Sequence, residues 1–174
     1  MNDFRTTEIK LIGAFFLVTG LFGFYTFLTL IFPLDNLISI INIFPTVLFG
    51  LTLYSGYLLL LKENVKGIEI ARAVMALQIL HFHIGGIGYL FVTGAFVFAG
   101  VNNLKFGFTF GFQNTFIINL SEETGGILFK VNVLAIAIFI YLTKVMKKIY
   151  EEQERIESLE NQKLNAEEDL KIEK

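Results

Sequence analysis

The chain contains two histidines, His81 and His83, and both lie in a run of 32 residues without a charged side chain. Ionisable side chains at membrane depth are costly to bury and are functional candidates by default. If this run is a helix, residues two positions apart point about 200° away from each other, so one metal ion does not reach both imidazoles. The chain has no cysteine, and no third ligand follows at helical spacing. We therefore expect no metal site and no bound cofactor.

A group of polar residues is expected to lie at similar depth on three helices, within hydrogen-bonding reach of one another. Its members are Thr19, Tyr54, Tyr57, Gln78 and His81. Hydrogen bonds between helices, worth about 0.6–2 kcal/mol each, would give this group a purely structural role in holding the bundle together. The alternative is a proton or ion pathway, or a pH-sensing His81, because histidine titrates near neutral pH.

Lys130 is expected roughly five residues below the outer membrane boundary, close to Asn132. The four-carbon stem of lysine can lift its ammonium group to the lipid headgroups. The alternative is an ion pair with Glu122 or Glu123, either within a pathway or between subunits. Lys130 and Asn132 therefore join the candidate polar residues.

Signatures of catalysis are missing from the chain, which has no G-x-S-x-G, no H-E-x-x-H and no Walker A motif. Asp and Glu are absent from all four membrane spans expected below, which removes the acidic proton relays that are common in pumps. We therefore expect a non-enzymatic protein. An intramembrane enzyme or a proton-coupled carrier that uses His81 is the weakest alternative.

The chain of 174 residues is 54% hydrophobic and 17% charged, and its charges are unevenly placed. The last 31 residues carry 16 of them, whereas the first 143 residues carry 14. This division predicts a membrane-embedded domain over 1–147 and a charged cytoplasmic helical tail over 148–174. The net charge of −2 gives no reason to expect nucleic acid as a partner.

Long uncharged stretches predict an all-α membrane protein with four transmembrane helices in a bundle. A helix needs roughly 20 apolar residues to cross the hydrocarbon core. The expected spans are 11–32, 38–61, 73–96 and 125–144. The basic clusters fall on one side of this arrangement, so both termini are expected in the cytoplasm and the chain in a bacterial inner or plasma membrane.

Small residues at three- and four-residue steps are expected to let neighbouring helices approach closely in lipid. Gly13, Gly20 and Gly23 provide such a face on the first span, and Gly85 and Gly88 provide one on the third. These five glycines are therefore expected to pack helices together.

Pro45 interrupts the second expected span. A proline inside a helix removes one hydrogen bond and kinks the helix, and we expect that kink here. The alternative is that Pro45 begins the helix, in which case 33–44 forms a segment at the outer interface.

The segment from 101 to 124 changes its hydrophobic period. Phenylalanines alternate with glycine and threonine from Phe106 to Phe112, and alternation with a period of two is typical of a strand. Gln113 and Asn114 offer a turn, and 115–120 has the composition of a second strand. We therefore expect an outer β-hairpin between the third and fourth helices.

The tail carries apolar residues at heptad spacing, among them Ile149, Ile156 and Leu170, which is a weak coiled-coil pattern. It contains neither proline nor glycine and is rich in good helix formers. A solvated helical extension of the fourth span is the preferred interpretation, and a coiled coil is the alternative.

Two principal hypotheses of function follow. The first is a self-associating integral membrane protein, which in its most specific form is a channel, a pore or a membrane-perturbing component. The glycine faces, the polar stripe on the third helix and the outer hairpin motivate it. The second is a membrane anchor or scaffold that recruits a cytoplasmic protein partner through 149–174, such as an accessory protein of a defence or envelope system. Both expect the lipid bilayer as a partner, and the first expects a homo-oligomer.

Overall fold

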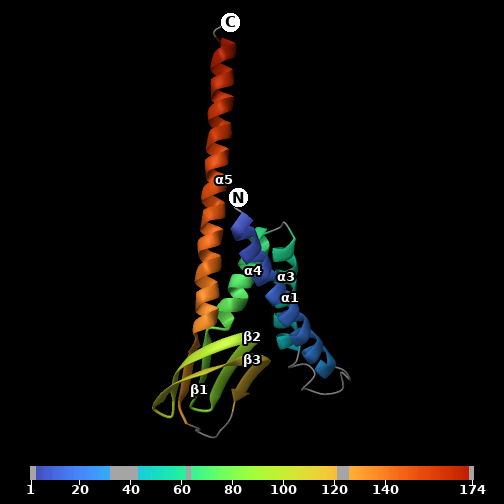
Figure 1. Ribbon diagram of the computed structural model, residues 1–174, viewed down its shortest axis with the longest axis vertical. Helices are drawn as coiled ribbons and strands as arrows, with labels where there is room; N and C mark the ends of the chain where they lie inside the picture. Colours follow the sequence, from blue (N-terminus) through green and yellow to red (C-terminus); the bar gives the residue numbers. More distant parts are fainter. Residues whose placement is uncertain (1–2, 32–42, 62–63, 121–125, 173–174) are drawn as a thin grey trace.

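The computed structural model describes residues 3–31, 43–61, 64–120 and 126–172. Its helices are α1 (Asp3–Ile31), α3 (Ile43–Leu60), α4 (Asn64–Leu77) and α5 (Val133–Ile172). Its strands are β1 (Leu80–Ile84), β2 (Ile87–Asn102), β3 (Lys105–Leu120) and β4 (Leu128–Asn132). The sheet lies at one end of the helical part, and α5 runs from the sheet past the other end (Figure 1).

The fold is mixed α/β, so the expectation of an all-α bundle is wrong. The expected third span, 73–96, divides into the end of α4, all of β1 and the first part of β2. The periodicity of an uninterrupted apolar run does not distinguish a buried helix from a buried strand. In β2 the abundance of Val, Ile, Phe and Tyr favours the strand. The expected fourth span, 125–144, likewise begins as β4 and becomes helical only at Val133.

The β-hairpin is longer than expected and turns at a different place. β2 and β3 pair along their whole length, from Ile87 with Leu120 to Asn102 with Lys105. Asn103 and Leu104 form the turn, with φ angles of 48° and 65°. Asparagine is common in left-handed backbone, whereas leucine is not, so only one of the two turn residues is a usual turn former. Residues 113 and 114, where the turn was expected, lie inside β3.

Two of the described helices are long and apolar enough to cross a membrane, α1 through Thr7–Thr29 and α3 through Ile43–Leu60. The expectation of four such helices is therefore wrong. Pro45 is the third residue of α3, so it lies in the first helical turn, where a missing N–H removes no intrahelical bond. The expected kink is thus wrong as well. Of the alternative interfacial segment, 33–42 lies outside the described residues.

α1 and α3 pack against each other through the glycines Gly13, Gly20 and Gly23 of α1 and Gly56 of α3. A Cβ atom on Gly20 would lie 2.4 Å from the main-chain nitrogen of Leu53. The partners on α3 run from Leu59 back to Phe49 as α1 advances, so the two helices are antiparallel. Only a residue without a side chain allows this backbone approach.

Gly85 and Gly88 do not pack helices, and that expectation is wrong. Gly85, with a φ angle of 58°, lies in the turn between β1 and β2. Gly88 lies in β2 opposite His83, and a Cβ atom on it would come within 2.9 Å of the His83 ring. Both glycines therefore shape the β1–β2 hairpin.

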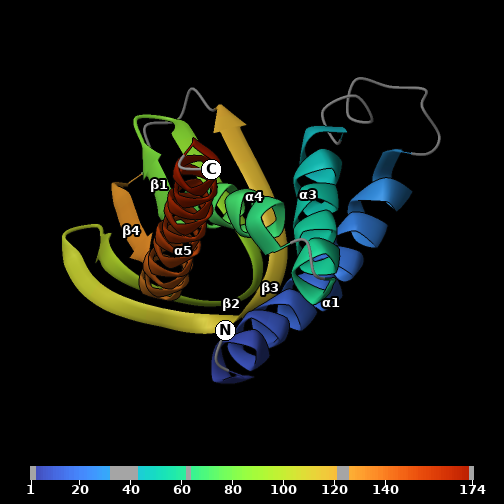
Figure 2. The same cartoon turned by 90° about the horizontal axis from the view of Figure 1, so that it is seen from above.

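β1, β2 and β4 each pair with the other two strands. β1 pairs with residues 87–90 of β2 and also with β4, and β4 pairs in turn with residues 98–102 of β2. β2 must bend to reach both partners, and Gly94, with a φ angle of 83°, lies between the two paired parts. The side chains of Phe15 and Thr19 of α1 fill the space that a Cβ atom on Gly94 would need. Figure 2 shows β2 and β3 curving around the base of α4 and α5.

Aromatic rings join the sheet to the helices. The ring of Phe49 in α3 lies 5.4 Å from that of Phe91 in β2, and Phe91 lies 6.2 Å from Phe116 in β3. Phe49 and Phe91 are fully buried in the main hydrophobic core. The sheet and the antiparallel helix pair therefore share one core.

We expect Gly20→Ala to lower the thermal unfolding midpoint of the purified protein in a mild detergent. Its new methyl group would meet the backbone of α3, and such overpacking costs about 1–3 kcal/mol. Gly50→Ala is the matched control, because a Cβ atom there meets nothing closer than 3.5 Å. The control should keep or raise the midpoint, since alanine is the better helix former by about 1 kcal/mol. Equal midpoints for the two variants would contradict the α1–α3 packing.

Candidate functional site

Two buried amide side chains bind the main chain of β2 at its bend. The Gln78 Oε1 atom accepts a hydrogen bond from the Thr93 N–H at 3.0 Å. The Asn132 Oδ1 atom accepts one from the Val97 N–H at 3.2 Å and another from the Ala135 N–H at 3.3 Å. Gln78 and Asn132 are each 1% exposed. We call these two side chains the amide clamp.

The amide clamp fills a gap in the strand pairing. On the side of β2 away from β3, β1 pairs with 87–90 and β4 with 98–102, so 91–97 has no strand beside it. A buried N–H group without a partner costs about 1–3 kcal/mol. Gln78 follows the last residue of α4, and Asn132 ends β4 and caps the first turn of α5. The clamp therefore connects both helices to the bend.

Some polar atoms beside the clamp remain unpaired. Gln78 Nε2, Thr93 Oγ1 and His81 Nδ1 are buried and have no hydrogen-bond partner among the described residues. Buried polar groups of this kind are uncommon in native proteins. All three atoms lie around β1 and the bend of β2.

The expected cluster of five polar residues does not assemble. Thr19 is buried, and its hydroxyl donates to the Phe15 carbonyl of its own helix at 2.9 Å. Tyr54 and Tyr57 are half exposed on the outer side of α3. Gln78 and His81 lie three residues apart in the region of the clamp, and Thr19 reaches the bend of β2 at Gly94 from α1.

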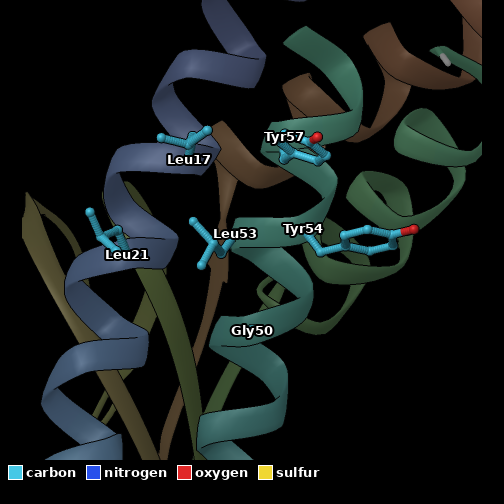
Figure 3. Close-up of a pocket in the computed structure, with 6 residues that line it drawn as sticks. All are labelled: Leu17, Leu21, Gly50, Leu53, Tyr54 and Tyr57. Carbon is cyan, nitrogen blue, oxygen red and sulfur yellow. The ribbon is translucent and has the colours of Figure 1, made fainter. Parts of the chain in front are cut away.

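Tyr54 and Tyr57 border an apolar groove between α1 and α3 of about 380 Å³. Leu17 and Leu21 of α1 and Leu53 of α3 line it, and the tyrosine hydroxyl groups point away from α1 (Figure 3). The groove presents hydrocarbon almost throughout, so it offers no group that could react with a bound molecule.

His81 and His83 lie in β1 and not in a helix. Alternate residues of a strand share a face, so the argument from helical angles that separated the two imidazoles does not apply. His81 pairs across the sheet with Lys130, and its ring lies 5.1 Å from that of Phe98. In the described part of the chain, no three His, Cys, Asp or Glu residues lie close enough to hold a metal ion.

Lys130 reaches across the sheet to a hydroxyl group. Its Nζ atom donates to the Thr109 hydroxyl of β3 at 3.0 Å. β2 lies between β4 and β3, and its residue Gly100 pairs with Lys130. Glu122 and Glu123, the expected alternative partners, lie outside the described residues.

A second set of contacts, which the sequence did not suggest, holds α5 against its neighbours. The Arg72 guanidinium of α4 lies over the Phe139 ring at 5.4 Å, and its Nη1 atom lies 3.3 Å from the Met146 sulfur. The Tyr150 hydroxyl donates to a Glu69 carboxylate oxygen at 3.2 Å, and this hydrogen bond raises the pKa of Tyr150. These partners are 67 to 81 positions apart, so no local sequence pattern reveals them.

We expect acid to destabilise the protein through His81. Burial, and then the positive charge of Lys130, hold the pKa of His81 below its ordinary value of 6.5. Above about pH 6.5 the histidine is neutral in both the folded and the unfolded chain, so the folded state keeps its full stability. Part of this stability is lost as the pH falls from there towards the lowered pKa.

The measurement is the thermal unfolding midpoint at pH 7.5 and at pH 5 in the same detergent. His81→Gln should have a smaller difference between the two pH values than the unchanged chain. His83→Gln, in the same strand, is the control and should keep the difference of the unchanged chain. The assignment to His81 fails if both variants behave alike.

The arrangement around the bend thus stabilises the fold. Away from the bend, the Tyr141 hydroxyl donates to a Glu8 carboxylate oxygen, and both side chains line an open pocket between α1 and α5. The comparisons with known proteins give no match: no family model, no curated protein and no solved structure is significantly similar to the chain.

Proposed function

We propose that this chain is a non-enzymatic membrane-anchored scaffold. In this proposal α1 and α3 cross the bilayer as an antiparallel pair, and α5 holds a helical protein partner on the cytoplasmic side. The apolar length of the two helices and their glycine packing support the anchor. The course of α5 supports the recruitment of a partner.

The orientation follows from the basic residues. α1 begins at the end of the protein towards which α5 extends, and the sheet lies at the opposite end (Figure 1). The basic residues of the helices include Lys10 in α1, Lys66 and Arg72 in α4, and Lys144, Lys147, Lys148 and Arg155 in α5. Lysine and arginine near membrane spans favour the cytoplasmic side. Both termini are therefore placed in the cytoplasm by this proposal, with the turn at Leu104 outside.

The observation that carries the proposal is an apolar stripe on α5 that continues beyond the part of the helix that packs against the rest of the protein. Leu142 and Val145 are buried in the core, and Ile149 packs against it. Ile156 and Leu159 continue the same face at heptad spacing, yet they are 52% and 49% exposed. Every described side chain from 151 to 162 is exposed. A stripe at this spacing fits the apolar face of another helix.

The channel and the enzyme hypotheses each lose one feature that motivated them. A channel depended on a polar stripe along one helix through Gln78 and His81, but α4 ends at Leu77 and His81 lies in a strand. An enzyme or proton-coupled carrier depended on His81, whose neighbours are Phe98 and Lys130 and include no acid–base partner that the structure describes.

The orientation predicts the labelling of single cysteines, because the natural chain has none. We expect a membrane-impermeant maleimide to label Leu104→Cys on intact spheroplasts and to label Gln153→Cys only after permeabilisation. Leu104 is 88% exposed and Gln153 lies in the exposed part of α5, so both thiols are accessible to reagent. The unchanged chain controls for background. If Gln153→Cys alone were labelled on intact spheroplasts, the orientation would be the opposite of the proposed one. If both variants were labelled, the anchor would be disproved.

Recruitment through α5 predicts face-specific crosslinking in the native host. A photo-crosslinking amino acid at Ile156 or Leu159 should capture a second protein. The same group at Glu154 or Ser158 should capture at least tenfold less, because these residues lie on the opposite side of the helix.

Mass spectrometry then identifies the captured chain. A distinct protein bound at the stripe positions supports the scaffold. Capture of a second copy of this chain, or equal capture from both sides of α5, contradicts it.

A further inference from the structure

β3 has one free edge. It pairs with β2 through sixteen consecutive residue pairs, and no other strand among the described residues lies on its far side. An unpaired edge presents a row of N–H and C=O groups that can accept another strand. At about 3.4 Å per residue, this edge extends for roughly 50 Å.

The hydrogen-bonding groups at this edge belong to the phenylalanines. In an antiparallel pair, residues alternate between pointing both main-chain groups at the partner strand and pointing both away from it. The N–H of Val97 is bound by Asn132, on the side of β2 away from β3. Its partner Phe110 therefore points its own N–H and C=O at the free edge. By alternation, the same holds for Phe108 and Phe112 on either side of it.

Nothing on β3 protects this edge. Natural edge strands are usually blunted by charges, by proline or by a bulge. From Phe106 to Leu120, β3 has no charged residue and no proline. Its register with β2 runs from end to end without an extra residue, so it has no bulge. The edge is thus open for pairing along its length.

The residues along the edge form a sequence that reads the same in both directions. Residues 106–112 are Phe-Gly-Phe-Thr-Phe-Gly-Phe, centred on Thr109. The four phenylalanines share one face of β3 and are 62–84% exposed. Gly107, Thr109 and Gly111 occupy the other face. Such a palindrome is complementary to itself when two copies run in opposite directions.

We propose that a second copy of the chain pairs with β3 edge to edge, antiparallel, about a two-fold axis at Thr109. This register places Phe106 opposite Phe112 and Phe108 opposite Phe110 of the second copy. The two-fold axis repeats both pairs, and each of the resulting four pairs exchanges two hydrogen bonds, so about eight bonds join the copies. Two-fold dimers of this self-complementary kind are the commonest protein oligomers.

The neighbouring residues agree with this register. On the face of β3 opposite the phenylalanines, Gly107 faces Gly111 of the second copy and Thr109 faces Thr109. The side chains that meet on this face are therefore small. Lys105 faces Gln113, so no like charges oppose each other. A second strand satisfies the main-chain groups of the edge directly. The palindrome adds a reason for a second copy over a different protein.

This inference goes beyond the scaffold function, because it concerns a surface at the opposite end of the protein from the exposed part of α5. Disulfide crosslinking of the full chain in a mild detergent tests it. Across the axis, Thr109 and its copy form a pair that is not hydrogen-bonded, with Cα atoms about 4.5 Å apart. That separation lies within the disulfide range of about 4.4–6.8 Å.

We expect Thr109→Cys to form a covalent dimer under mild oxidation, and a mixture of Lys105→Cys with Gln113→Cys to form a mixed dimer. The mixture leaves Thr109 in place as the acceptor for Lys130, so it guards against local damage by the first variant. Leu104→Cys is the control for random collision, because it lies in the exposed turn and faces Asn114 in this register. The two pairing tests should exceed this control at least tenfold.

A proline provides a further test. Phe108 points its N–H at the free edge, so Phe108→Pro removes an edge donor without removing a bond to β2. In the Thr109→Cys background it should lower the disulfide yield at least tenfold.

Every other outcome overturns the proposal. If Lys105→Cys alone forms as much dimer as Thr109→Cys, the copies are parallel and in register. If no variant exceeds the Leu104→Cys control, β3 does not pair with a copy, whether or not the protein runs as a dimer. The labelling and photo-crosslinking results for α5 do not depend on this interface, so failure here is distinct from failure of the scaffold.

Discussion

The bend of β2 leaves main-chain N–H groups without a strand beside them, and the rest of the structure depends on how those groups are satisfied. A backbone that changes direction in an apolar interior must find partners for its donors. Gln78 and Asn132 provide them for Thr93 and Val97. Without these two amides, the strand could not leave β1 and reach β4 at so low a cost in free energy.

The same two amides decide where the helices meet the sheet. Gln78 stands at the end of α4, and Asn132 stands at the start of α5, so each clamp residue is also a boundary between a helix and the sheet. On the other side of the bend, α1 fills the space over Gly94 with Phe15 and Thr19. The contacts of one short piece of strand thereby position three helices.

Sequence reasoning succeeded where composition decides the structure and failed where partners are distant. The apolar lengths of α1 and α3 were recognisable, since both pass the length and composition test for a membrane span. Gln78 and Asn132 were recognisable as polar residues in apolar runs, but their partners are main-chain groups, which no side-chain pattern reveals. β2 was taken for a helix because its small residues also fall at helical spacing. Its strand is stabilised by sixteen pairs with β3, and the pattern within β2 alone does not reveal that partner.

The junction at Asn132 has a mechanical consequence. β4 passes into α5 with no intervening loop, and the Asn132 side chain bonds to β2 and to the first turn of the helix together. A helix of 40 residues is about 60 Å long, so α5 behaves as a lever arm fixed in the sheet. A tilt of roughly 10° at its base carries the far end through about 10 Å. Small distortions of the sheet are thus transmitted, without a flexible joint, to the opposite end of the molecule.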